Sequence, residues 1–154
     1  MYNSKSFLDL KVIWKDNDMF ELQVKASNDC YMGTTNVYDT KESLSSFAQL
    51  LKGYPKDNNV LFYQAGQKDN NDSYAYFSMK FYCIDNAGHV GVQINLEENV
   101  ATEYRPEEKD KVILEILVEP AAIDRFQKDL FDLATKEDGQ AILIGNNLER
   151  NASR

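Results

Sequence analysis

The stretch that most constrains the fold runs from Tyr74 to Glu97, YAYFSMKFYCIDNAGHVGVQINLE. Apolar and polar residues alternate along both of its halves, and a period of two is typical of strands with one buried face. If residues 85–88 form a four-residue loop, the halves pair as a β-hairpin with both apolar rows on one face. The predicted facing pairs are Cys83 with Val90, Phe81 with Val92, Met79 with Ile94 and Phe77 with Leu96 on the apolar face, and Tyr82 with Gly91, Lys80 with Gln93 and Ser78 with Asn95 on the other.

Further strands are predicted before and after this hairpin. Residues 7–14 and 19–26 alternate, and a three-residue turn at residues 16–18 pairs Trp14 with Phe20 and Val12 with Leu22 on the apolar face. Residues 30–38 then form a third strand. Residues 60–66 and 112–118 add two more, and the outer side of 112–118 is partly apolar because it carries Ile113 and Leu117.

Two helices are predicted. Asp39 as N-cap, with Glu42 three residues on, begins a helix that buries Leu44, Phe47, Ala48 and Leu51 and ends at Gly53. Pro120 begins the second, which runs to Thr135 with apolar residues at helical spacing. It should pack back on the sheet and cover the outer side of residues 112–118. The short run AILIG at residues 141–145 adds a small strand or a packing plug.

Together these elements predict one α+β domain over residues 1–154, with a largely antiparallel, curved sheet of about six or seven strands and two helices, the C-terminal one packed on the sheet. Residues 1–6 and about 146–154 are polar enough to fray. No apolar run approaches the roughly 20 residues that span a bilayer, so we expect a soluble, cytoplasmic protein that does not enter a membrane. The two cysteines, Cys30 and Cys83, should be reduced core thiols.

Catalytic and metal-binding patterns are missing from the sequence. His89 is the only histidine, which excludes mechanisms and metal sites that need two imidazoles. There is no G-x-S-x-G elbow, Walker loop or G-x-G-x-x-G fingerprint. The acidic turns at residues 16–18 and 69–72 lack the glycine and the closing glutamate of an EF-hand loop. We predict no catalytic residue, no metal site and no cofactor, and we expect His89 to be an exposed hairpin residue.

The charge favours a basic protein partner. Net charge is −8 and the pI is about 4.7, which argues against binding a nucleic-acid backbone. Residues 97–138 hold 13 acidic and 6 basic residues, a net charge of −7, and residues 97–111 form the longest predicted loop. The predicted partner-binding residues are the acids and tyrosine of this loop, Glu97, Glu98, Glu103, Tyr104, Glu107 and Glu108, and the outward tyrosines of the hairpin, Tyr74, Tyr76 and Tyr82. Alternatively, the hairpin tyrosines pack under the C-terminal helix, with Tyr82 covering Gly91.

Two segments, GTTNVYDTKESLSSFAQLLKGYP at residues 33–55 and YFSMKFYCIDNAGHVGVQINLEE at residues 76–98, carry a likeness to a known family. With them the chain resembles, in the order of its patterns over residues 20–134, the WapI-type immunity proteins. These are small cytosolic bacterial proteins that bind and neutralise the toxic C-terminal domain of a contact-delivered toxin. The resemblance implies a non-enzymatic protein that occludes a toxin domain, and it brings no catalytic signature.

Two other functions remain open on the sequence. One is a small-molecule-binding or enzymatic domain with a pocket between the sheet and the helices, and with His89 and tyrosine hydroxyls at its mouth. The other is a self-associating structural module that uses the partly apolar side of residues 112–118. The oligomeric state is open as well.

Overall fold

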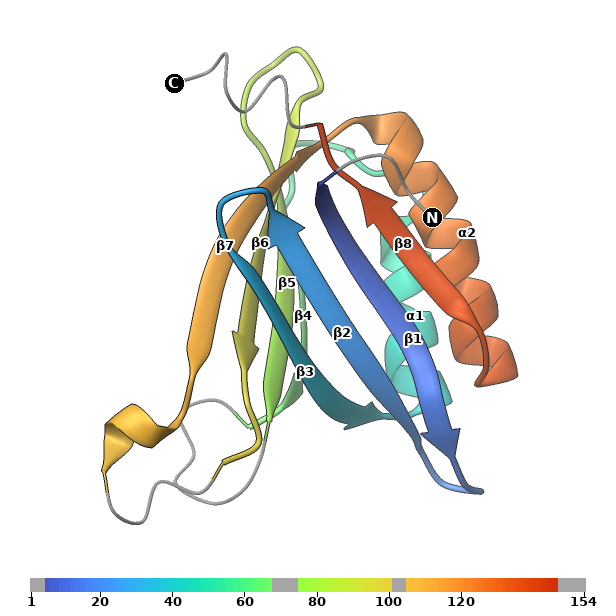
Figure 1. Cartoon of the computed structure of the whole chain (residues 1–154). Helices are drawn as coiled ribbons and strands as arrows, with labels where there is room; N and C mark the ends of the chain where they lie inside the picture. Colours follow the sequence, from blue (N-terminus) through green and yellow to red (C-terminus); the bar gives the residue numbers. More distant parts are fainter. Residues whose placement is uncertain (1–4, 68–74, 101–104, 147–154) are drawn as a thin grey trace.

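The structure, a computed structural model, describes residues 5–67, 75–100 and 105–146 (Figure 1). Eight strands form two antiparallel four-stranded sheets. Sheet A has the order β3-β2-β1-β8, with β1 at Ser6–Lys15, β2 at Phe20–Asn28, β3 at Met32–Asp39 and β8 at Gln140–Ile144. Sheet B has the order β4-β5-β6-β7, with β4 at Leu61–Gly66, β5 at Tyr76–Cys83, β6 at Val90–Glu97 and β7 at Lys111–Val118.

Two α-helices lie on one side of sheet A. Helix α1 spans Lys41–Leu51, α2 spans Pro120–Lys136, and a short 3₁₀ helix, η1, spans Pro106–Glu108. Figure 1 shows α1 behind β1 and α2 beside β8. The side-chain amide of Gln127 on α2 donates to the Ala48 carbonyl of α1 over 3.0 Å, and Phe47 on α1 reaches the Tyr63 ring of sheet B at 5.4 Å between centroids. The sheets and helices therefore enclose one shared core.

The α+β class, the predominance of antiparallel pairing and the packing of the C-terminal helix on a sheet are confirmed. The strands number eight in two sheets, rather than six or seven in one, for two reasons. Residues 140–144 do form a strand, β8, against β1. Helix α1 also lies between β3 and β4 in the sequence. β4 therefore does not follow β3 through a short turn, and it pairs with β5 in the second sheet.

The central hairpin has the predicted register. All of the predicted facing pairs of β5 and β6 are confirmed. The Ile84 amide donates to the His89 carbonyl over 2.9 Å, which closes the loop at residues 85–88. Phe77, Met79 and Phe81 are fully buried, so the alternation identified the core face correctly.

The first hairpin departs from the predicted register at a β-bulge. Val12 faces Leu22 as predicted, but the register then shifts and Trp14 faces Glu21, with Lys15 opposite Phe20. The extra residue turns the following side chain to the other face of the strand. Trp14 is therefore 46% exposed, and its predicted position in the core is wrong.

Three smaller predictions are also wrong. The N-cap of α1 is Thr40, whose hydroxyl accepts from the Ser43 amide, because the Asp39 carboxylate is held by the Tyr63 hydroxyl. Neither cysteine is a core residue: Cys30 is exposed because the β2–β3 turn carries it, and Cys83 is half-buried, although both are free thiols. β1 begins at Ser6, inside the segment predicted to fray.

The predicted cover of the outer side of β7 by the C-terminal helix is wrong. Helix α2 packs on β8 and α1, and Ile113 remains 60% exposed. In the described residues, no helix has the length and apolar composition of a membrane span.

Candidate functional site

The outer face of sheet A is a solvent-facing surface with both helices on its other side (Figure 1). Along its strands, fully buried residues such as Leu10 and Leu22 alternate with half-buried or exposed polar ones. The register places three outward rows on this face: Trp14, Glu21 and Tyr38; Lys11, Gln23 and Asn36; and Asp9, Lys25 and Thr34. The centre of the face is thus polar with both signs of charge, and large apolar groups lie at its ends.

An aromatic pair marks one end of this face. Trp14, the only tryptophan, and Tyr38 both face Glu21 from the strands on either side of it. Their rings meet edge to face, with centroids 6.1 Å apart and planes at 88°, and Tyr38 is 53% exposed. Met19 nearby in the sequence is 38% exposed. We call Trp14, Met19 and Tyr38 the aromatic surface.

Acidic groups border the aromatic surface in the β1–β2 turn. The Asp16 carboxylate accepts from the amides of Asp18 and Met19 over 2.8 and 2.9 Å, and these hydrogen bonds lower the pKa of Asp16. Asp16 and Asp18 are exposed and Glu21 is half-buried, against two neighbouring cations, Lys15 next to Trp14 in the chain and Lys11 in the next outward row. The charge beside the aromatic surface is therefore negative at neutral pH.

A partly buried pair, Asp39 and Tyr63, holds the end of β3 next to Tyr38. The Tyr63 hydroxyl donates to the Asp39 carboxylate, which also accepts from the Thr40 amide over 2.8 Å. Burial raises the pKa of Asp39, and burial next to that carboxylate raises the pKa of Tyr63. This link joins sheet A to sheet B, so the position of Tyr38 is set by both sheets.

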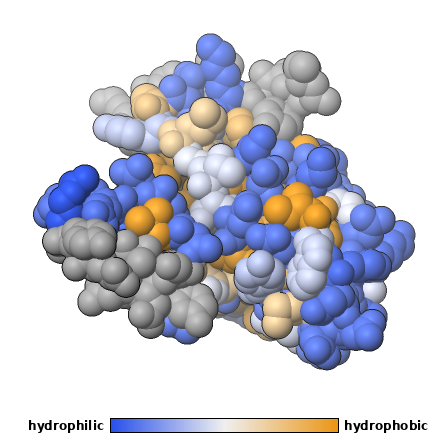
Figure 2. Space-filling view, turned by 60° about the horizontal axis from the view of Figure 1, so that its bottom comes forward, coloured by the Kyte–Doolittle hydropathy of each residue, from blue (hydrophilic) through white to orange (hydrophobic). Residues whose placement is uncertain are grey.

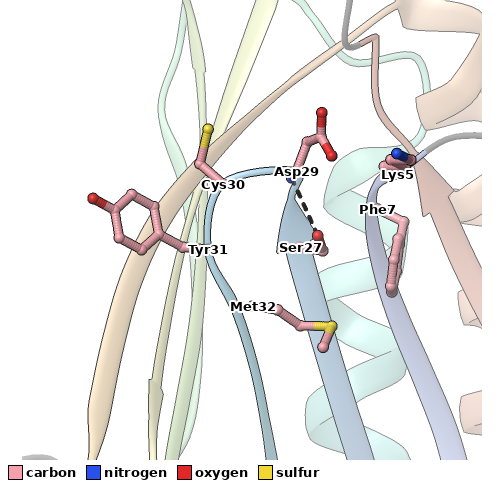
Figure 3. Close-up of a pocket in the computed structure, with 7 residues that line it drawn as sticks. All are labelled: Lys5, Phe7, Ser27, Asp29, Cys30, Tyr31 and Met32. Atoms are coloured by element: carbon pink, nitrogen blue, oxygen red, sulfur yellow. Dashed lines mark hydrogen bonds between the residues drawn. The ribbon is translucent and has the colours of Figure 1, made fainter.

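Surface grooves lie at both ends of β3. The groove beside the aromatic surface has a volume of about 390 Å³ and is lined by Met19, Asn36, Val37, Tyr38, Gly66, Gln67, Ala75 and Asn99. A second hollow of about 410 Å³ lies at the β2–β3 turn, and Figure 3 shows Met32 and Phe7 over the strand ends, with Tyr31 and Cys30 turned away from them. Figure 2 shows the underside of the molecule as mainly hydrophilic, with small separate hydrophobic patches.

Two of the predicted partner-binding residues have almost no accessible surface. Glu97 is 1% exposed, and its carboxylate lies 3.8 Å from the Lys109 ammonium. Tyr76 is 3% exposed and donates its hydroxyl to the Gln64 side chain over 3.0 Å. Tyr76 lies on the outer face of sheet B as predicted but is buried there, whereas Glu97, which was predicted in the loop, is the last residue of β6.

The other predicted residues are scattered. Tyr82 is half-buried, lies over Gly91 and donates to Glu115, as the alternative interpretation predicted for its contact with Gly91. Glu98 is half-buried and accepts from the Asp110 amide over 2.9 Å, whereas Glu107 is exposed and Glu108 half-buried in η1. Tyr74, Glu103 and Tyr104 lie outside the described residues.

His89 lies in the hairpin loop, where its Nδ1 is 2.7 Å from Asp85 Oδ2. This contact and the Ala87 amide lower the pKa of the exposed Asp85 carboxyl. Within the described ranges, no group of three or more His, Cys, Asp and Glu side chains is arranged to hold a metal ion. The contact between His89 and Asp85 therefore joins two residues four positions apart across the hairpin loop.

The aromatic surface was missed in the sequence because strict alternation assigned Trp14 to the core. One signal was present: Val12, Ile13 and Trp14 are consecutive large apolar residues, and they cannot all point to the same face of a regular strand. Such a run is compatible with a bulge. Comparisons of the chain with protein-family models, with curated proteins and with solved structures found no significant match.

Proposed function

We propose that this chain is a non-enzymatic protein-binding domain that neutralises a cognate toxin domain, and that it binds its partner through the aromatic surface. The observation that carries the binding role is the pair of half-exposed rings, Trp14 and Tyr38, on a sheet face that has both helices on its other side. The toxin-neutralising role comes from the resemblance to WapI-type immunity proteins. It is the more specific part of the proposal.

The physical case for binding rests on the residue types and their setting. Tryptophan and tyrosine offer large apolar area with few rotatable bonds, and they dominate the binding energy of protein interfaces. The two rings already support each other edge to face in the free protein, so little side-chain entropy is lost when a partner orders them. Trp14 and Tyr38 are therefore suited to anchor an interface.

The charges around the aromatic surface specify the kind of partner. Asp16 and Asp18 flank the rings, and the whole chain carries a net charge of −8. Such a field accelerates encounters with a basic protein surface and slows encounters with an acidic one. The proposed partner is a basic toxin domain whose surface has an apolar centre to receive the rings.

The test pairs the chain with a basic toxin domain of the kind proposed as its partner. Trp14→Ala and Tyr38→Ala should each weaken binding by about 30- to 1,000-fold, since central aromatic anchors contribute about 2–4 kcal/mol. Leu50→Ala is the matched control, because Leu50 is an exposed apolar side chain, 62% exposed, on α1. It should leave the affinity unchanged within about threefold. Calorimetry gives the affinities, and growth of cells that express the toxic domain gives the neutralisation.

Two outcomes would count against the proposal. Equal losses for Leu50→Ala and Trp14→Ala would mean that the aromatic surface has no special role. Growth that the unmodified chain does not restore, despite measured binding, would leave a binding domain and remove the toxin-neutralising role.

A further inference from the structure

β3 is an edge strand whose free side is not used by the described part of the chain. Sheet A ends at β3, which pairs with β2 alone. The Asn28 amide donates to the Tyr31 carbonyl at the β2–β3 turn, and antiparallel pairing alternates from there. The backbone groups of Gly33, Thr35 and Val37 therefore point to β2. Those of Met32, Thr34, Asn36 and Tyr38 point to the free side.

Open space runs along this free side. One groove of about 440 Å³ is lined by Met32, Gly33, Thr34, Leu96, Glu98, Asp110, Lys111 and Val112. The groove of about 390 Å³ beside the aromatic surface continues past Asn36 and Tyr38. Glu98 borders the first and its neighbour Asn99 the second, so the two grooves follow one another along β3 and together make up one binding region. We call this region the edge groove.

The side chains that face inward hold β3 in place without using its free side. The Thr35 hydroxyl donates to the Glu97 carbonyl over 2.8 Å. A Cβ on Gly33 would lie 2.6 Å from a Val112 methyl group, so the backbone of β3 approaches sheet B closely at that point. The edge is therefore presented as a preformed strand.

β3 differs from the edge strand β7 and from most natural edge strands. The outer edge of β7 is covered, because the Asn28 side chain donates to the Glu115 carbonyl over 3.3 Å and the Asn146 amide to the Leu117 carbonyl over 2.7 Å. Natural edge strands are usually protected by lysine, proline or a bulge. Residues 32–38, MGTTNVY, contain no charge and no proline, and their register with β2 has no shift.

We propose that β3 receives an extended, Lys- or Arg-containing segment of the protein partner as an added strand in the edge groove. This inference rests on the proposed protein-binding function and continues the aromatic surface, with which it shares Met19 and Tyr38. A partner strand would form backbone hydrogen bonds along β3, and its alternate side chains would enter the groove. The groove carries the carboxylates of Glu98 and Asp110 against one cation, Lys111, which favours a basic segment.

A second copy of the chain fits the edge groove less well. Two copies would each bring a net charge of −8 to the contact. Pairing of β3 with its own copy would also bring the acidic groove walls of both molecules together. A basic segment from a different protein is not repelled by the net charge of the chain or by the acidic groove walls.

The experiment uses a peptide probe of about ten residues with alternating Lys and Val, long enough to pair along a whole strand. At about millimolar concentration it should shift the backbone amide NMR signals of Met32, Thr34, Asn36 and Tyr38. It should also slow their hydrogen exchange by about tenfold or more. A peptide with Glu in place of Lys tests the charge, and a peptide methylated at alternate backbone nitrogens tests the strand pairing. Neither should bind.

Variants of β3 test the same inference by changing the protein instead of the peptide. Asn36→Pro removes one backbone donor from the free edge, where proline is tolerated, and should abolish the effect of the probe. Asn36→Ala keeps the donor and should retain it. Equal binding of the methylated peptide or of the Glu peptide, shifts confined to other strands, or no shift at all would overturn the inference. So would a doubled mass without peptide that Asn36→Pro abolishes, because the occupant would then be a second copy. None of these results changes the Trp14→Ala test, so the two proposals fail separately.

Discussion

The buried ion pair between Glu97 and Lys109 gives a sharp test of how the β6–β7 connection is held. The Lys109 ammonium lies 3.8 Å from the Glu97 carboxylate, and the two side chains are 2% and 1% exposed. At this distance the attraction is about 4 kcal/mol for an effective dielectric constant of about 20. Lys109→Met leaves the carboxylate in its buried position without the lysine, which typically costs about 3–5 kcal/mol. Because small domains are stable by only about 5–15 kcal/mol, this single change should remove a large part of the stability.

A double-mutant cycle separates the pair from its setting. Glu97→Gln should also destabilise the fold, because it leaves the ammonium buried without the carboxylate. The combined variant Glu97→Gln/Lys109→Met should recover most of the loss, since both charges of the pair are then removed together. Urea unfolding followed by far-UV circular dichroism gives the three free energies. Losses below about 1 kcal/mol for both single variants would refute the reasoning, because they are what a solvated surface pair would show.

Three further predictions follow from other contacts. Gly91→Ala would place a Cβ 2.5 Å from the Tyr82 ring and should cost about 1–3 kcal/mol in urea unfolding, whereas a loss below about 0.5 kcal/mol would mean that Tyr82 moves freely. Burial raises the pKa of the Asp39 carboxyl above 3.8. Its protonation therefore contributes to the free energy of unfolding most fully below pH 3.8, and this contribution is lost as pH rises through the higher folded-state pKa. Asp39→Asn, which still accepts from Tyr63, should remove that decline, and identical pH profiles for both proteins would contradict it. Asp18→Lys should slow association with a basic partner at low salt and have little effect at high salt, as stopped-flow measurements can show; a rate unchanged at low salt would remove the turn from the encounter surface.

The sequence predicted the parts of the fold in which neighbouring residues decide the outcome. The shared buried face of β5 and β6 was predictable because an even-numbered loop places both apolar rows on one side, whereas an odd-numbered loop would need a bulge. The end of α1 was predictable because Gly53 takes a positive φ of 74° and Pro55 follows. Both results depend on residues close in the chain.

The features of the fold that the sequence did not predict depend on contacts between residues far apart in the chain. The division into two sheets depends on how sheet A lies against sheet B, as in the bond from Thr35 to the Glu97 carbonyl. The Asp39 carboxylate accepts a hydrogen bond from the Tyr63 hydroxyl, 24 residues away, and Asp39 is not the N-cap of α1. Alternation placed Tyr76 on the outward face correctly, but it could not show that Tyr76 is buried or that Glu97 is buried beside Lys109.

The same holds for the candidate site. A bulge moves Trp14 from the core side to the surface, and only the three-stranded register shows that it meets Tyr38 across Glu21. The acidic character of the chain was evident from composition, whereas the carboxylates next to the rings, Asp16 and Asp18, are not those of the predicted loop.

Trp14 itself can report whether the aromatic surface meets a partner, because it is the only tryptophan in the chain. Labelling the chain with 5-fluorotryptophan gives a single ¹⁹F signal from a ring that is 46% exposed in the free protein. When the partner binds, we expect this signal to shift and broaden and to lose its sensitivity to solvent, because the ring becomes buried in the interface. An unchanged ¹⁹F signal in a complex whose formation is confirmed by its mass would contradict the proposed interface.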